Sequence, residues 1–154
     1  MAKFKMSVLV PTGQVDTARV GATGSTVALT EANVGKFFKL TADSQYAMCA
    51  VTNPIEGVLI AVDPATRDGY VIGSVQKGGR IDALCDGLQA TPGTGTIAVG
   101  DLVVCGTVVA DGTALTTAPK VCKATAQTAA VFNWRVVSLG NAGAVGDTCV
   151  IEKV

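Results

Sequence analysis

The chain has 154 residues, a mass of 15.5 kDa and 12 basic against 12 acidic residues, so its formal net charge is zero. That size favours one domain, or one domain with an arm, and the balanced charge argues against a nucleic-acid-binding protein, which needs surplus cations to displace counterions from phosphate. The chain also lacks histidine, which removes the commonest general base, the commonest transition-metal ligand and every Ser-His or Cys-His nucleophile pair.

The first 29 residues are expected to form a strand followed by an extended arm. Over residues 3–10, cationic and apolar side chains alternate at first, which differs from a signal peptide and predicts one apolar strand face, made by Phe4, Met6 and Val8. Residues 11–25 are polar and rich in Gly and Thr, which is typical of an arm or a long loop. No run reaches the ~18 apolar residues of a membrane helix, so we expect a soluble protein made in a cytosol.

From residue 30 onward, β-strand patterns recur about every ten residues. One helical turn comes first, which Thr30 caps and Gly35 ends. Strands are then expected at residues 36–40, 45–51, 56–62, 70–77, 80–85, 100–105, 107–110, 120–124, 132–139 and 148–152. The apolar run 56–62 predicts a strand buried on both faces. Gly78-Gly79 stands between two alternating runs and predicts a hairpin.

Helix is expected nowhere else, except for a turn or two that the alanines of residues 125–131 permit. The fold class is therefore all-β: a compact β-barrel or sandwich of about ten short strands with an extended N-terminal arm. Residues 1–29 form the N-terminal strand and arm, and residues 30–154 form the β-domain. Val34 to Phe38 and Val99 to Val103 look alike at an offset of 65, for which common turn chemistry is a better explanation than duplication.

The polar and cysteine residues contain no recognisable chemical motif. The five cysteines are odd in number, lack a Cys-x-x-Cys pair and have apolar neighbours, which predicts small buried side chains that stay reduced: Cys49, Cys85, Cys105, Cys122 and Cys149. The acidic residues are scattered singly, and we interpret all twelve as solvated turn residues. The glycine clusters match neither phosphate-binding pattern, and Trp134 is expected in the core. We predict no catalytic residue, no cofactor and no metal.

Charged residues make up only 16% of the chain, against roughly 25% in an average soluble domain. A neutral, sparsely charged surface promotes association. We therefore expect another protein to cover part of this surface.

Residues 30–154 contain several patterns of a turn followed by a strand. They are a Val-Gly turn before a strand at 34–40, an apolar strand at 55–59, a Val-Gln-x-Gly-Gly stretch at 75–79, a Val-Gly-Asp-x-Val turn at 99–103 and the closing run 134–151. Together these residues resemble the head decoration, or capsid cement, proteins of tailed bacteriophages, which are small β-proteins rich in Gly, Ala, Thr and Val.

The resemblance implies a structural function. Such proteins bind the outer face of an icosahedral shell, often as dimers or trimers at local symmetry axes, and stabilise the head against the pressure of packaged DNA. The partner implied is the major capsid protein, together with further copies of this chain, and neither nucleic acid nor membrane. The location implied is the outer capsid surface of the virion, after synthesis in the host cytoplasm.

The candidate capsid-binding residues lie mainly in the N-terminal strand and arm. They comprise apolar anchors, cations for capsid acids and two cations at the predicted hairpin tip: Phe4, Met6, Val8 and Leu9; Lys3, Lys5 and Arg19; Lys77 and Arg80. An extended arm can add a strand to a neighbour's open sheet edge. Two alternatives stay open, namely that residues 3–10 are the first strand of the protein's own barrel and that the tip cations only aid solubility.

The sequence is also compatible with two other functions. One is a different virion or surface β-module, such as a head-fibre base, a tail component or a carbohydrate-binding domain. A sugar-binding protein usually needs exposed aromatic rings for stacking, and the chain has only seven aromatic residues (one Trp, two Tyr and four Phe). The other is a small enzyme whose paired carboxylates come from distant positions.

Overall fold

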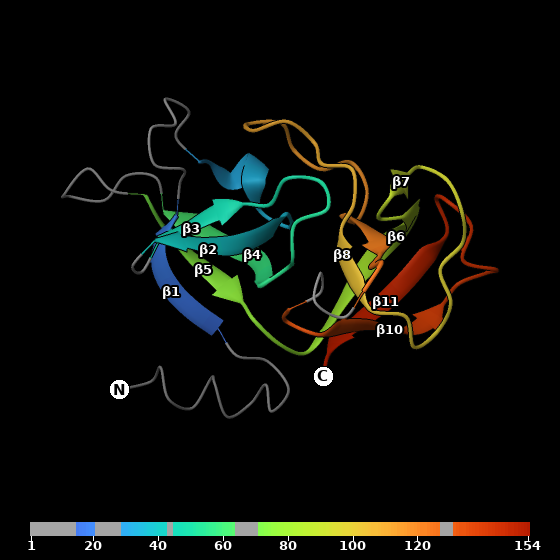
Figure 1. The fold of residues 1–154 in the computed structure, drawn as a ribbon. Coiled ribbons are helices and arrows are strands. Elements are labelled where there is room, and N and C mark those ends of the chain that lie inside the picture. The colour runs from blue at the N-terminus through green and yellow to red at the C-terminus, as the bar shows by residue number, and fades with distance from the viewer. Residues whose placement is uncertain (1–14, 21–28, 43–44, 64–70, 127–130) are drawn as a thin grey trace.

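The computed structural model describes residues 15–20, 29–42, 45–63, 71–126 and 131–154. These residues form eleven strands and one short 3-10 helix, so the prediction of an all-β fold is confirmed. The strands form two sheets that lie side by side (Figure 1). The first contains β1 (Val15–Val20), β2 (Phe37–Ala42), β3 (Gln45–Met48), β4 (Gly57–Asp63) and β5 (Ile72–Gln76). The second contains β6 (Arg80–Leu88), β7 (Thr91–Pro92), β8 (Val103–Cys105), β9 (Lys120–Lys123), β10 (Trp134–Leu139) and β11 (Thr148–Lys153).

The first sheet is a small ring of strands in the order β1-β3-β2-β4-β5. β1 closes it, because it pairs antiparallel with β5 and, over Arg19 and Val20, parallel with β3. The prediction that residues 11–25 form an arm or loop is therefore wrong for residues 15–20. Their composition is that of a loop, but strands on both sides satisfy their backbone groups, and Val20 is buried inside the ring.

Gly78-Gly79 does not form the predicted hairpin. β5 pairs with β1 and β4, whereas β6 pairs with β11, β9 and β7, so the two glycines carry the chain from the first sheet to the second. Gly79 has a φ of +81°, and the Gln76 side chain donates to the Gly78 carbonyl at 2.7 Å. A Gly-Gly pair allows a sharp change of direction without specifying which strands pair afterwards.

The second sheet has the order β10-β11-β6-β9-β8, with β7 paired to β6. Backbone from elsewhere covers both outer strands. At β8, Cys105 N donates to Asn53 O at 2.9 Å, and at β10, Val136 N donates to Asp101 O at 2.9 Å. The prediction of a strand at 107–110 is wrong, because these residues belong to an irregular segment, residues 106–119. The valines of this stretch pack over the boundary between the two sheets instead of pairing with another strand.

The two sheets share a core. The neighbouring Phe37 and Phe38 of β2 point to opposite faces, so that Phe38 lies in the cluster inside the ring and Phe37 in the cluster between the sheets. Trp134 lies in the second cluster, as expected. The predicted strand at 56–62 is buried only over residues 56–59; beyond them, the register shifts between Leu59 and Ala61 and leaves Ile60 exposed.

Two local predictions are confirmed. Thr30 caps the 3-10 helix η1 (Glu31–Asn33), since its hydroxyl accepts from Ala32 N at 3.3 Å, and Gly35 ends the turn with a φ of +89°. All five cysteines are free and buried, and burial raises the pKa of Cys122 and of Cys149 to about 12. The expectation of a helical turn at 125–131 falls partly on residues outside those described.

Candidate binding surface

Most of the predicted capsid-binding residues lie outside the described residues: Lys3, Phe4, Lys5, Met6, Val8 and Leu9. Arg19 is placed only by its backbone, in β1 between β3 and β5. The role of the N-terminal segment therefore stays a prediction, and so does the alternative that residues 3–10 form a strand of the protein's own barrel.

Lys77 does not lie at an exposed hairpin tip. Its Nζ atom lies 3.0 Å from Asp16 Oδ2 and 3.1 Å from Glu56 Oε1, and 5.2 Å from the centre of the Tyr46 ring. The Tyr46 hydroxyl is within 3.1 Å of both carboxylates. The predicted location at a hairpin tip is wrong, because the crossover directs the Lys77 side chain toward two carboxylates. Binding of a partner by Lys77 stays a prediction.

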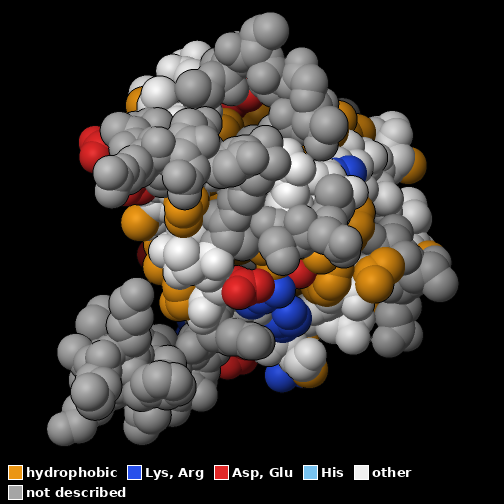
Figure 2. Space-filling view, turned by 90° about the vertical axis from the view of Figure 1, so that its left-hand side faces the viewer, with side chains coloured by type: hydrophobic (Ala, Val, Ile, Leu, Met, Phe, Trp, Pro, Cys, Tyr) orange, Lys and Arg blue, Asp and Glu red, His pale blue; other side chains and the backbone are white. Residues whose placement is uncertain are grey.

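This polar cluster, formed by Asp16, Tyr46, Glu56 and Lys77, stabilises the fold through paired charges and hydrogen bonds; we call it the clamp. The hydrogen bond from Lys77 holds the pKa of Asp16 below its usual value, and burial raises the pKa of Tyr46 to about 12. Glu56 is buried and also accepts a hydrogen bond from Leu40 N at 2.8 Å. The cluster ties β1, β3, the start of β4 and the crossover together. Acidic and basic side chains lie beside one another on the face of the first sheet (Figure 2).

The interpretation of every acidic residue as a solvated turn residue is wrong for Glu56 and Asp86, which are buried. It is also wrong in its turn assignment for four acids that lie in strands: Asp16, Asp63, Asp82 and Glu152. Asp86 is 2% exposed; its Oδ2 accepts from Thr107 N at 2.6 Å and from Thr107 Oγ1 at 2.7 Å, and Lys120 Nζ lies 3.8 Å from its Oδ1. These contacts hold the start of segment 106–119. No pattern around either acid signals its burial, since the partners come from distant positions.

Arg80 keeps the exposure expected of a surface cation. Its side chain is 69% exposed, and its Nε lies 3.6 Å from Glu152 Oε1. Lys77 and Arg80 do not act together as a cationic tip, because each pairs with different acids. Binding of a partner by Arg80 stays a prediction.

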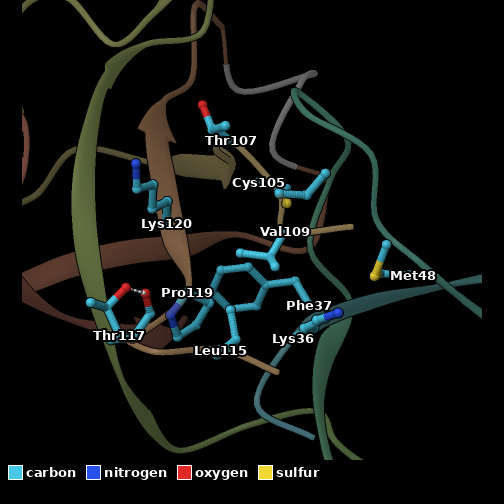
Figure 3. A pocket seen from close by; sticks show the side chains of 12 residues that line it. Lys36, Phe37, Met48, Cys105, Thr107, Val109, Leu115, Thr117, Pro119 and Lys120 are labelled. Carbon is cyan, nitrogen blue, oxygen red and sulfur yellow. Dashed lines mark hydrogen bonds between the residues drawn. The ribbon is translucent and has the colours of Figure 1, made fainter. Parts of the chain in front are cut away.

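Segment 106–119 covers a small cavity at the seam between the sheets (Figure 3). The Phe37 ring lies among Val109, Leu115 and Pro119, and the cavity has a volume of about 40 Å³. Two hydrogen bonds hold the segment over the first sheet: Lys36 Nζ donates to Ala110 O at 2.8 Å, and Asn33 Nδ2 donates to Asp111 Oδ1 at 2.6 Å. A space of this size holds a few water molecules, so we interpret it as a packing defect under the segment and not as a substrate site.

The exposed loops of the second sheet form a surface without charge. Residues 88–100 and 140–146 contain no Lys, Arg, Asp or Glu, and nearly all of them are exposed. The two stretches touch where Ile97 N donates to Gly143 O at 2.9 Å, and the first folds back on itself where Leu88 N donates to Thr94 O at 2.9 Å. They lie together on the side of the second sheet away from the first (Figure 1). We call these residues the uncharged surface.

Two of the neighbouring cations are paired with acids. Over residues 87–146, the charged residues are Asp101, Asp111, Lys120, Lys123 and Arg135. Lys123 Nζ lies 3.0 Å from Asp101 Oδ1, Lys120 pairs with Asp86, and Asp111 accepts from Asn33. Arg135 and Asp147 are further charged residues beside the uncharged surface.

Two turns on the uncharged surface are identical in sequence and geometry. Ala98-Val99-Gly100-Asp101 and Ala144-Val145-Gly146-Asp147 each carry a glycine with a φ of +91°. In each, the aspartate carboxylate accepts from the alanine N–H, at 2.8 and 2.9 Å, and the aspartate N–H donates to the alanine carbonyl, at 3.1 and 3.0 Å. In each, the glycine N–H donates to a strand carbonyl at 2.8 Å. The valines are 60% and 43% exposed.

The likeness between residues 34–38 and 99–103 also arises from a turn in which a glycine adopts a positive φ and donates to a strand carbonyl. Gly35 has a φ of +89°, Lys36 N donates to Asn33 O at 3.2 Å, and Gly35 N donates to Leu59 O at 2.7 Å. The Val-Gly turn is therefore used three times, each time before a strand. The identical tetrapeptides at 98–101 and 144–147 are the signal in the sequence for these two turns of the uncharged surface.

Comparisons with family models, curated proteins and solved structures found no match for this chain. Within the described ranges, His, Cys, Asp and Glu side chains do not gather in threes as a metal ion would require. The described part of the chain also contains no helix of the length and apolar character needed to cross a membrane.

Proposed function

We propose that this chain is a structural virion protein that binds the outer surface of a phage capsid and stabilises the shell of major capsid protein. The observation that carries the proposal is the uncharged surface, residues 88–100 and 140–146, beside which Lys120 and Lys123 are paired with acids. The cores of protein interfaces are depleted in charge, because an unpaired charge that loses water costs several kcal/mol. A large exposed region without charge can lie against another protein without that cost.

The architecture supports the same function. One sheet closes on itself and the other has backbone partners on both outer strands, so the body is suited to bear load without pairing its own edges with other chains. Decoration of a shell by dimers or trimers multiplies weak contacts into firm attachment. We propose that oligomeric state together with the function.

The aromatic residues count against the carbohydrate-binding alternative. Phe37, Phe38, Tyr46 and Trp134 are buried, and Phe132 packs against the core with Lys153 Nζ 5.5 Å from its ring centre. Stacking on a sugar needs an exposed ring face. Among the described residues, the aromatic rings thus pack within the protein and do not offer an exposed face to a sugar.

The test is co-sedimentation with DNA-free heads assembled from the major capsid protein of the same phage. We expect saturable binding at a stoichiometry set by the shell's symmetry, and decorated heads that resist heat better than bare ones. Because the proposed contact is uncharged, binding should change less than about threefold between 50 and 500 mM NaCl, whereas attachment through Lys and Arg would weaken strongly. Folded protein that stays in the supernatant with heads at micromolar concentration would refute the proposal.

A further inference from the structure

The two identical turns, residues 98–101 and 144–147, each contain one residue whose identity the turn geometry does not require. Their glycines adopt a positive φ, and their aspartates make the hydrogen bonds that close each turn. Valine stands at the first central position, which accepts most residue types and favours proline. Val99 and Val145 are 60% and 43% exposed, so they contribute little to packing. A single exposed valine is ordinary, but here the same valine occurs twice in the same geometry.

The two valines lie within a limited distance of each other in the fold. Each stands two residues after the contact at which Ile97 N donates to Gly143 O, so their Cα atoms are at most about 20 Å apart along the chain path. Residues 97–99 and 143–145, which connect the two valines through this contact, belong to the uncharged surface. The fold thus presents two exposed valines, in turns of the same sequence and hydrogen bonding, within the width of a small protein interface.

We infer that Val99 and Val145 are paired contact points that bind two equivalent apolar sites on the protein shell; the inference rests on the function proposed above. Identical projections select identical receptor sites, and a lattice built from one repeated subunit supplies such sites at fixed separations. A polyanion or an anionic membrane would instead select clustered cations, which this surface lacks over residues 88–100 and 140–146. Two contacts in one chain also strengthen attachment beyond either contact alone.

The experiment compares Val99→Asp, Val145→Asp and the double variant with the full-length protein in co-sedimentation with DNA-free heads. Val51→Asp is the matched control, because Val51 is 40% exposed in a turn of the first half of the chain, outside the uncharged surface. We expect each single variant to bind about tenfold more weakly and the double variant about a hundredfold. The control should bind like the unmodified protein.

Val99→Thr and Val145→Thr keep the branched shape and guard against a folding defect, and they should weaken binding by about threefold each. Circular dichroism and thermal unfolding establish that every variant is folded. If the unmodified protein fails to bind heads, the proposed function is wrong. If it binds and the aspartate variants bind equally well, or only one valine matters, the paired-contact inference is wrong. A loss of solution oligomers in light scattering, with head binding of the remaining monomers retained, would also overturn it by assigning the surface to contact between copies.

Discussion

The Nζ atom of Lys77 lies 3.1 Å from Oε1 of Glu56, a carboxylate that is 6% exposed. The same ammonium lies 3.0 Å from Asp16 in β1, so one lysine joins the strand that closes the ring to the start of β4. Removing a single partner from such a cluster leaves a buried charge without compensation, which costs more than the cluster itself contributes to stability.

Lys77→Met should therefore destabilise the protein clearly. We expect the free energy of unfolding in urea to fall by about 2 kcal/mol, below the usual range for a buried pair because Asp16 is half exposed. Arg80→Met is the control, since Arg80 and Glu152 form an exposed pair that contributes at most about 0.5 kcal/mol. Equal effects of the two substitutions would contradict the clamp.

Stability should fall at both ends of the pH scale. Lys77 lowers the pKa of Asp16 in the folded state, so this contribution is present above the unfolded value of 3.8 and is lost as the pH drops through the lowered value. Burial raises the pKa of Tyr46 to about 12, so its contribution is present below 10 and is lost between pH 10 and about 12.

Urea unfolding as a function of pH checks both limits. Asp16→Asn should flatten mainly the acid limb, and Tyr46→Phe mainly the alkaline limb, with a smaller effect of each on the other limb because the two side chains share a hydrogen bond. Absorbance of tyrosinate should also show one tyrosine that ionises near pH 12. An acid limb that keeps its slope in Asp16→Asn would show that other carboxylates dominate it.

Gly143 should tolerate no side chain. Its φ is +78°, and a Cβ atom there would collide with the Ile97 carbonyl, which belongs to the contact joining the two stretches of the uncharged surface. We expect Gly143→Ala to cost more than about 3 kcal/mol in thermal unfolding. Gly93 has a φ of +84°, but its Cβ position meets no atom of the described residues within 4 Å, so Gly93→Ala should cost only about 1 kcal/mol of backbone strain. Similar losses would show that strain alone matters at Gly143.

The cysteines should be unreactive in the folded protein. All five are buried, and burial raises the pKa of Cys122 and of Cys149 to about 12, which keeps the reactive thiolate scarce at neutral pH. Ellman's reagent should therefore modify none of them within minutes in buffer and all five in guanidinium chloride. Fast reaction of even one thiol in the native state would contradict the burial.

Local features could be predicted because their causes lie within a few residues. Alternating patterns predicted most strands, the Thr30 cap and Gly35 predicted the single helical turn, and apolar neighbours predicted the buried cysteines. A strand period, a capping hydroxyl and a glycine with positive φ all act over less than one element, so the chain specifies them directly.

Pairing and exposure depend instead on residues far apart in the chain. Nothing near residues 15–20 indicates that strands on both sides will enclose them, and Gly78-Gly79 permits a crossover as readily as a hairpin. Lys77 reads as a surface cation until Asp16 and Glu56 are brought beside it from 61 and 21 positions away (77 − 16 and 77 − 56). The uncharged surface also depends on distant residues. The sequence specifies that the two loops lack charge, but the contact of Ile97 with Gly143 brings the loops together.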